Sequence, residues 1–180
     1  MLKIIVPGTT LWDEVNEVFI ETEDTELILE HSLVSVSKWE AIWHKSFVSN
    51  KEKSVDEIIS YIECMCMNDS VDTNVFKCLT KNNVDSIVKY IEEPMTATCF
   101  PYASKKRTKR DAVTSELIYY WMVALNIPME CQYWHLNRLL TLIHVCEIKS
   151  TPPKKMSRRE IMERNKMLND KRRKELNSKG

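Results

Sequence analysis

Glycine is almost absent from this chain, which contains only Gly8 and Gly180 among its 180 residues. Loops that cradle phosphates rely on left-handed backbone conformations, which glycine adopts most readily. Dinucleotide and nucleoside-triphosphate fingerprints each need several glycines at fixed spacing, so the sequence excludes both. We therefore predict no cofactor.

Long apolar runs are lacking as well, because His, Asn or Arg interrupts each apolar stretch within a few residues. A membrane-spanning helix needs about 20 predominantly apolar residues. Only five apolar residues precede Pro7 and Gly8, which is too few for a secretory signal. We expect no membrane span and no export, and the six cysteines should then stay reduced rather than form a disulfide framework.

The charge is zero in total but is unevenly distributed along the chain. Residues 1–30 hold eight acids against Lys3, whereas residues 151–180 hold eleven bases against four acids. The residues between them hold fourteen of each sign. Net charge governs association rather than fold. The two charged ends therefore predict a protein partner or intramolecular docking.

Three short β-branched or aliphatic runs, at residues 2–6, 17–21 and 26–30, are separated by turn-forming residues. They predict a small antiparallel sheet whose acids line the solvent face. So few strands are stable only when they pack on other elements. We therefore expect residues 1–30 to form an acidic β element that packs on the core.

Residues 31–150 show helical periodicity and are predicted to form the core domain. Trp39, Ile42, Trp43 and Phe47 follow the spacing of one helix, and Ser54 with Glu57 is a capping box that opens another. The remaining helices are predicted at residues 75–79, 84–92, 113–125 and 131–148. Residues 95–101 are predicted to be an extended connector or a lone strand, and residues 105–110 an exposed basic loop.

The composition changes abruptly after Pro152 and Pro153. Ser157 and Glu160 form another capping box, and the helix that they open carries few apolar residues among clustered bases. Such a helix is marginal on its own and either docks or frays. The predicted fold is therefore mainly α: a helical domain with a small N-terminal antiparallel β element and a basic C-terminal helical tail, residues 151–180.

Cysteine and histidine do not occur with the spacing of structural zinc sites. Cys131 and His135 would share a helix face but need two more ligands. Cys64, Cys78 and Cys146 lie within apolar helical patterns rather than in the electropositive settings that activate a thiol. We predict no metal, no catalytic residue and no enzymatic activity. A cavity around Cys131, His135 and His144 would overturn this prediction.

Two basic runs, residues 105–110 and Lys171, Arg172, Arg173 and Lys174, could attract backbone phosphates. The neutral total charge and the absence of aromatic residues between the bases favour solvated surface or an acidic protein partner over nucleic acid. The acidic N-terminal segment of this same chain could also pair with these two basic runs. Lys171 to Lys174 are accordingly candidate partner-binding residues.

Polar residues interrupt an otherwise apolar helix at residues 134–143. A buried polar side chain needs a hydrogen-bond partner. His135, Asn137 and Arg138 are therefore either structural, satisfied by carbonyl groups near residues 94–101, or part of a groove for a partner. The second interpretation makes Trp134, His135, Asn137 and Arg138 candidate partner-binding residues.

Four segments together resemble a group of tailed-bacteriophage proteins: Met95 to Thr98, Ile118 to Met122, Trp134 to Ile143 and the basic run from Pro152 to Lys155. The resemblance is to small tail assembly chaperones encoded beside the tape measure protein, and it covers roughly residues 30–180. It implies a non-enzymatic helical protein of the host cytoplasm that shields the tape measure protein while the tail tube polymerises. No site residue carries over.

A second interpretation is a structural component of the virion tail or neck. A protomer with an acidic and a basic end could bind head to tail as a homo-oligomer, and such heterologous contacts build rings or filaments. The partner would then be another tail protein or a copy of the chain.

Overall fold

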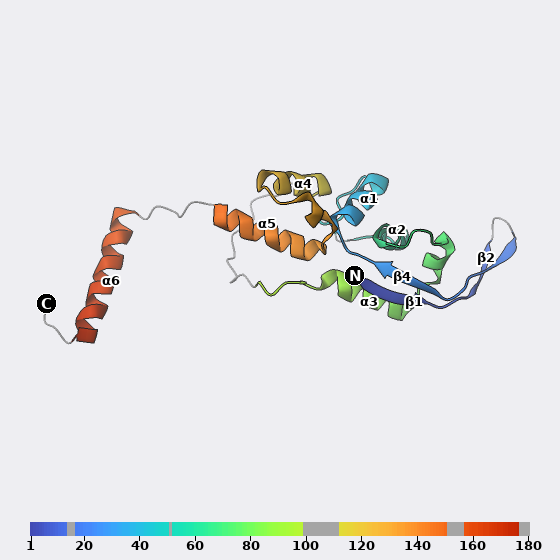
Figure 1. The fold of residues 1–180 in the computed structure, drawn as a ribbon, viewed down its shortest axis with the longest axis horizontal. Coiled ribbons are helices and arrows are strands. Elements are labelled where there is room, and N and C mark those ends of the chain that lie inside the picture. Colours follow the sequence, from blue (N-terminus) through green and yellow to red (C-terminus); the bar gives the residue numbers. More distant parts are fainter. Residues whose placement is uncertain (14–16, 51, 99–111, 151–156, 177–180) are drawn as a thin grey trace. The chain divides into compact units, whose positions relative to one another are not determined.

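Residues 1–13, 17–50, 52–98, 112–150 and 157–176 are described by a computed structural model (Figure 1). Two compact units divide the chain, Met1–Glu147 and Ile148–Gly180. The predicted fold class is confirmed: the described chain is mainly helical, with antiparallel strands at the N-terminus and a helix near the C-terminus. The predicted basic loop at 105–110 lies outside the described residues, and Met95–Thr98 forms no strand.

The N-terminal strands form two two-stranded antiparallel ribbons instead of one sheet. β1 (Leu2–Val6) pairs with β4 (Thr25–Leu29), and β2 (Thr10–Asp13) pairs with β3 (Val18–Glu21). The prediction of three strands was wrong because it missed β2. This strand has only four residues and follows Pro7 and Gly8, which are typical of a turn.

The two ribbons meet at a joint around Gly8. The Gly8 amide donates to Asp24 Oδ1 (2.7 Å), and the Thr22 amide donates to the Thr9 carbonyl (2.9 Å). A Cβ on Gly8 would lie 2.4 Å from the Thr22 carbonyl oxygen. Glycine is therefore required here because the backbones approach too closely for any side chain.

The β1–β4 ribbon packs on the helices and is covered along both outer edges. Val6, Leu27 and Leu29 are buried in the core. The Asn83 side chain donates to the Ile5 carbonyl (2.8 Å), and the Met67 amide donates to the Ile28 carbonyl (2.8 Å) along β4. The outer edge of β4 is thus occupied, and that of β1 is contacted at Ile5.

Glu30 corrects the prediction that the acids of the β element face solvent. Its carboxylate is buried, accepts a hydrogen bond from the Tyr90 hydroxyl (2.8 Å) and pairs with the amino group of Met1 (2.9 Å). Glu26, by contrast, is exposed and lies 3.6 Å from Lys3. Glu30 faces inward because it directly precedes the buried segment that leads into the first helix.

Local capping signals explain where most helices begin. The capping box of Ser54 and Glu57 is confirmed, and Ser157 and Glu160 exchange the corresponding hydrogen bonds. The helices are α1 (Leu33–Trp43), α2 (Val55–Met65), α3 (Lys81–Glu92), α4 (Ser115–Ala124), α5 (Leu136–Ser150) and α6 (Arg158–Leu176), with 3₁₀ helices η1 (Thr73–Cys78) and η2 (Met129–Tyr133). The predicted helix at 131–148 begins later because η2 and an extended Trp134 precede it.

The core of the first unit is organised around Trp39 on α1. This side chain is fully buried, its Nε1 donates to the Glu57 carbonyl (2.8 Å), and its ring packs edge-on against Phe47. The neighbouring Glu40 carboxylate is also buried and accepts the amides of Phe47 (2.8 Å) and Ser115 (2.7 Å). α1, the turn that follows it and the start of α4 are thereby joined.

Candidate functional site

The predicted site at residues 134–138 lies where the start of α5 meets the end of α3. His135 Nδ1 accepts the Asn137 amide (3.3 Å), and Nε2 therefore carries the proton that is donated to the Tyr90 carbonyl (3.0 Å). The Asn137 side chain donates to the carbonyls of Ile91 and Glu93, each at 2.9 Å. The last carbonyls of a helix lack partners within that helix. His135 and Asn137 supply such partners to α3.

The carbonyls that satisfy these residues belong to positions 90–93, immediately before the segment 94–101 named from the sequence. Arg138 differs from its neighbours, since it is exposed and its guanidinium lies 4.1 Å from the centre of the Trp134 ring. Of these four residues, only Arg138 is exposed; Trp134 and Asn137 are partly buried, and His135 is buried. A partner-binding function of these four residues stays a prediction.

His135 also belongs to a buried cluster with His31 and Tyr61. His31 Nδ1 and the Tyr61 hydroxyl are 2.5 Å apart, and the ring centres of His31 and His135 are separated by 5.0 Å. Burial, with a smaller contribution from His135, lowers the pKa of His31 to about 3. Burial also lowers the pKa of His135 and raises that of Tyr61. At neutral pH the cluster is therefore a set of uncharged hydrogen-bonding groups.

This cluster predicts that acid destabilises the fold. An unfolded histidine has a pKa near 6.5, and His31 in the folded chain has a pKa of about 3. Below pH 6.5 the unfolded chain therefore binds a proton that the folded chain excludes. Between about pH 7 and pH 5 the free energy of unfolding should fall by about 2 kcal/mol through His31 alone, and His135 acts in the same direction. Urea titrations at both pH values measure this change.

A matched pair of variants separates His31 from other titrating groups. His31→Asn should flatten the decrease between pH 7 and pH 5, whereas His44→Asn should leave it unchanged, because His44 is exposed and asparagine tolerates its left-handed backbone. An equal pH dependence in wild type and His31→Asn would contradict the prediction.

Two thiols, those of Cys64 and Cys131, show the opposite of activation. Burial raises the pKa of Cys64 and that of Cys131, which is opposite to the change in a nucleophilic cysteine. Across the described ranges, no three His, Cys, Asp or Glu side chains are grouped as ligands for a metal ion. Cys99 lies outside the described residues.

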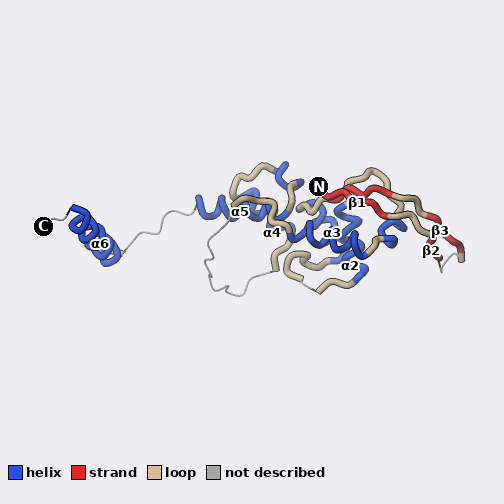
Figure 2. The backbone as a smooth tube through the Cα atoms, turned by 90° about the horizontal axis from the view of Figure 1, so that it is seen from below, coloured by secondary structure: helices blue, strands red, loops and turns tan. Residues whose placement is uncertain are grey.

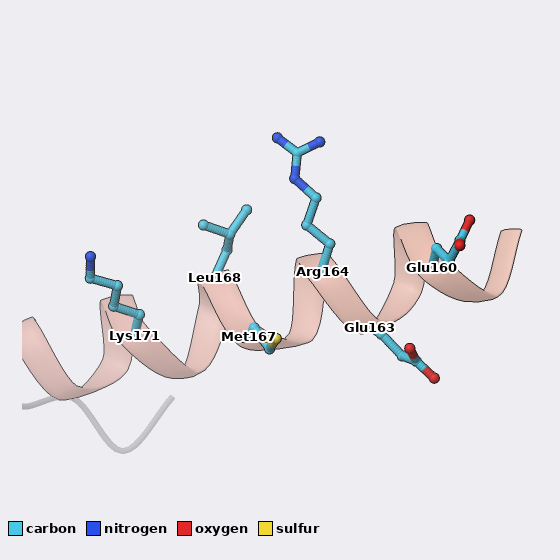
Figure 3. A pocket seen from close by; sticks show the side chains of 6 residues that line it. All are labelled: Glu160, Glu163, Arg164, Met167, Leu168 and Lys171. Carbon is cyan, nitrogen blue, oxygen red and sulfur yellow. The ribbon is translucent and has the colours of Figure 1, made fainter. Parts of the chain in front are cut away.

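The candidate residues of the tail lie on α6, where no side chain is buried. Lys171 lies 3.9 Å from Glu175, and no ion pair is formed by Arg172, Arg173 or Lys174 within the described part of the chain. A hollow on this helix is lined by six side chains of α6 alone (Figure 3). In that view Leu168 and Lys171 point the same way, so apolar and basic groups share one surface.

An exposed aromatic pair was missed at the sequence level. Trp12 and Phe19 face each other across β2 and β3 with ring centres 4.8 Å apart, and they remain 51% and 71% exposed. We call residues 10–13 and 18–21 the aromatic arm. Both views show it extending beyond the helices of its unit (Figure 1, Figure 2). The alternation of Thr10 and Trp12 was an available signal, but four residues are too few to reveal a strand.

Comparison with known proteins identifies no relative: no family model, no curated protein and no solved structure matches the chain. The helices of the described ranges all fall short of the length and apolarity that crossing a membrane requires. A functional inference therefore depends on the surfaces themselves and on the resemblance carried by the sequence.

Proposed function

We propose that this protein is a non-enzymatic protein-binding factor of phage tail assembly that chaperones the tape measure protein in the host cytoplasm. The observation that carries the proposal is α6, a 19-residue helix without one buried side chain. An isolated helix of this length is marginal in water unless it packs against something. A partner surface would supply that packing.

The chemistry of α6 suits a long, variable protein partner. Met162 and Met167 are exposed, and methionine side chains adapt to irregular apolar surfaces. Ile161 and Leu168 add apolar contact area among the bases. This combination favours a partner with apolar side chains flanked by acids. It matches the task of covering an apolar polypeptide better than the recognition of a small molecule.

A structural component of the virion tail or neck is the second candidate. It is favoured by the opposite charges of two exposed elements, namely the acids around the aromatic arm and the bases of α6. Such a protein would self-associate through its acidic N-terminal and basic C-terminal ends. The two candidates differ in whether the protein leaves the assembled tail or stays in it.

Co-expression with the tape measure protein tests the first candidate. We expect a complex at low salt that weakens at least about tenfold when Lys171, Arg172, Arg173 and Lys174 are all changed to Glu. Changing exposed bases of the first unit instead, Lys77 and Lys81, should leave the complex intact and serves as the control. Absence of a complex would contradict the chaperone proposal. Stoichiometric copies of the protein in purified virions would support the structural candidate.

A further inference from the structure

The aromatic arm lacks the covering that a two-stranded ribbon needs. An isolated hairpin is marginally stable in water, and further strands or a packed helix normally supply the missing burial. The strand register places Glu21 on the same face as Trp12 and Phe19, because side chains two apart along a strand share a face. The arm is thus an aromatic surface that carries Glu21 and is flanked by Glu17 and Glu23, and no lysine or arginine of the described ranges pairs with these three acids.

α6 also has no buried side chain, but its excess charge is positive. Ile161, Leu168, Arg172 and Leu176 are spaced by seven, four and four residues, which places them along one side of a helix. All four are exposed. This side of α6, which we call the basic stripe, presents apolar side chains with a guanidinium group between them.

We propose that the aromatic arm of one molecule binds the basic stripe of α6 in a second copy of the chain. The inference rests on the proposed protein-binding function and names one partner for it. Leu168 and Ile161 would cover the Trp12 and Phe19 rings. The guanidinium of Arg172 suits the face of an aromatic ring, which attracts cations.

The opposite charges of the arm and α6 favour a second copy of the chain as the partner. The residues around the arm are acidic and those of α6 are basic, so arm meeting arm or tail meeting tail would bring like charges together. Arm meeting tail joins opposite charges and covers apolar groups on both sides. The contact is heterologous, so it builds a ring or an open chain unless two molecules exchange tails reciprocally.

Sedimentation velocity of the full chain over a range of concentrations tests the proposal. We expect assembly at about 50 mM salt that dissociates at about 500 mM. The double change Trp12→Ser and Phe19→Ser should weaken assembly at least about tenfold, since central aromatic residues dominate interface energies. Val88→Ser is the control, because Val88 is an exposed apolar residue of α3, 46% exposed, and belongs to neither surface. Thermal melts verify that each variant is folded.

Charge exchange gives the sharper test. One variant carries Glu17→Lys and Glu21→Lys on and beside the arm, and the other carries Arg172→Glu and Arg173→Glu on α6. Each should assemble more weakly alone than the wild type, because its exchanged side chains face like charges on the other surface. The mixture should assemble, because the new lysines beside the arm of the first variant meet the new glutamates on α6 of the second, while the unchanged α6 of the first meets the unchanged arm of the second.

Three results would overturn the proposal: a monomeric wild type at every concentration and low salt, unchanged assembly of the arm variants, or no assembly of the mixture. A monomer whose size changes with salt would indicate docking within one chain instead. Loss of tape measure binding in arm variants without any self-association would assign the arm to that partner. Failed self-association beside an intact tape measure complex would contradict this inference and the structural candidate but not the chaperone proposal. Self-association without a tape measure complex would contradict only the chaperone proposal.

Discussion

Replacement of Trp39 by alanine should lower the free energy of unfolding by about 3–5 kcal/mol, the usual cost of truncating a fully buried tryptophan. The side chain is 0% exposed and contacts the rings of Trp43 and Phe47. Its indole N–H also donates to the Glu57 carbonyl, which joins α1 to α2. The substitution would therefore open a cavity and remove this hydrogen bond together.

Chemical denaturation at neutral pH measures this loss, and two other tryptophans provide a graded comparison. Trp121→Ala should cost less than Trp39→Ala because Trp121 is only partly buried. Trp12→Ala should change the stability of the core by less than about 1 kcal/mol, as substitutions at exposed sites usually do. A loss below about 1 kcal/mol for Trp39→Ala would show that this residue is not the centre of the core.

Replacement of Glu40 by alanine should cost about 2–4 kcal/mol, because it removes two charge-assisted hydrogen bonds to backbone amides. The acceptor oxygens lie 2.8 Å from the Phe47 amide and 2.7 Å from the Ser115 amide. Ser115 begins α4, and a carboxylate is favourable near the positive end of a helix. Without Glu40, the turn after α1 and the start of α4 would each lose a partner.

The control variants for Glu40 separate charge from hydrogen bonding. Glu40→Gln keeps one acceptor oxygen and should cost roughly half as much. Glu63→Ala should be nearly neutral, because Glu63 is an exposed acid on α2 without such partners. The same denaturation measurements compare the three variants. Equal stability of Glu40→Ala and Glu63→Ala would contradict the structural function assigned to Glu40.

Helices could be predicted from the sequence where local chemistry fixes them. The caps at Ser54 and Ser157 act on neighbouring amides, so their effect is visible in a short window. Helical periodicity was a weaker guide to burial for residues at the margins of each apolar face. Ile42 follows the same helical spacing as Trp39 and Phe47 but is 60% exposed, because neighbouring elements cover only part of α1. That coverage depends on residues distant in sequence.

In the candidate site, too, the sequence indicated the polar residues but not the distant residues that they contact. The sequence singled out His135 and Asn137 as polar residues in an apolar helix, but their partners on α3 lie more than forty positions away. The aromatic arm could not be predicted, since the exposure of Trp12 and Phe19 follows from where the joint at Gly8 directs the second ribbon. Exposure of an aromatic residue is a property of the whole fold.

The unequal covering of the two ribbons has a consequence for solubility. β1 and β4 have their outer edges occupied by Asn83 and Met67, whereas uncovered strands are templates on which further strands can grow. Like charges on the acids around β3 should then keep neighbouring molecules from joining edge to edge at high protein concentration. Neutralising these acids should therefore make the protein more prone to aggregate.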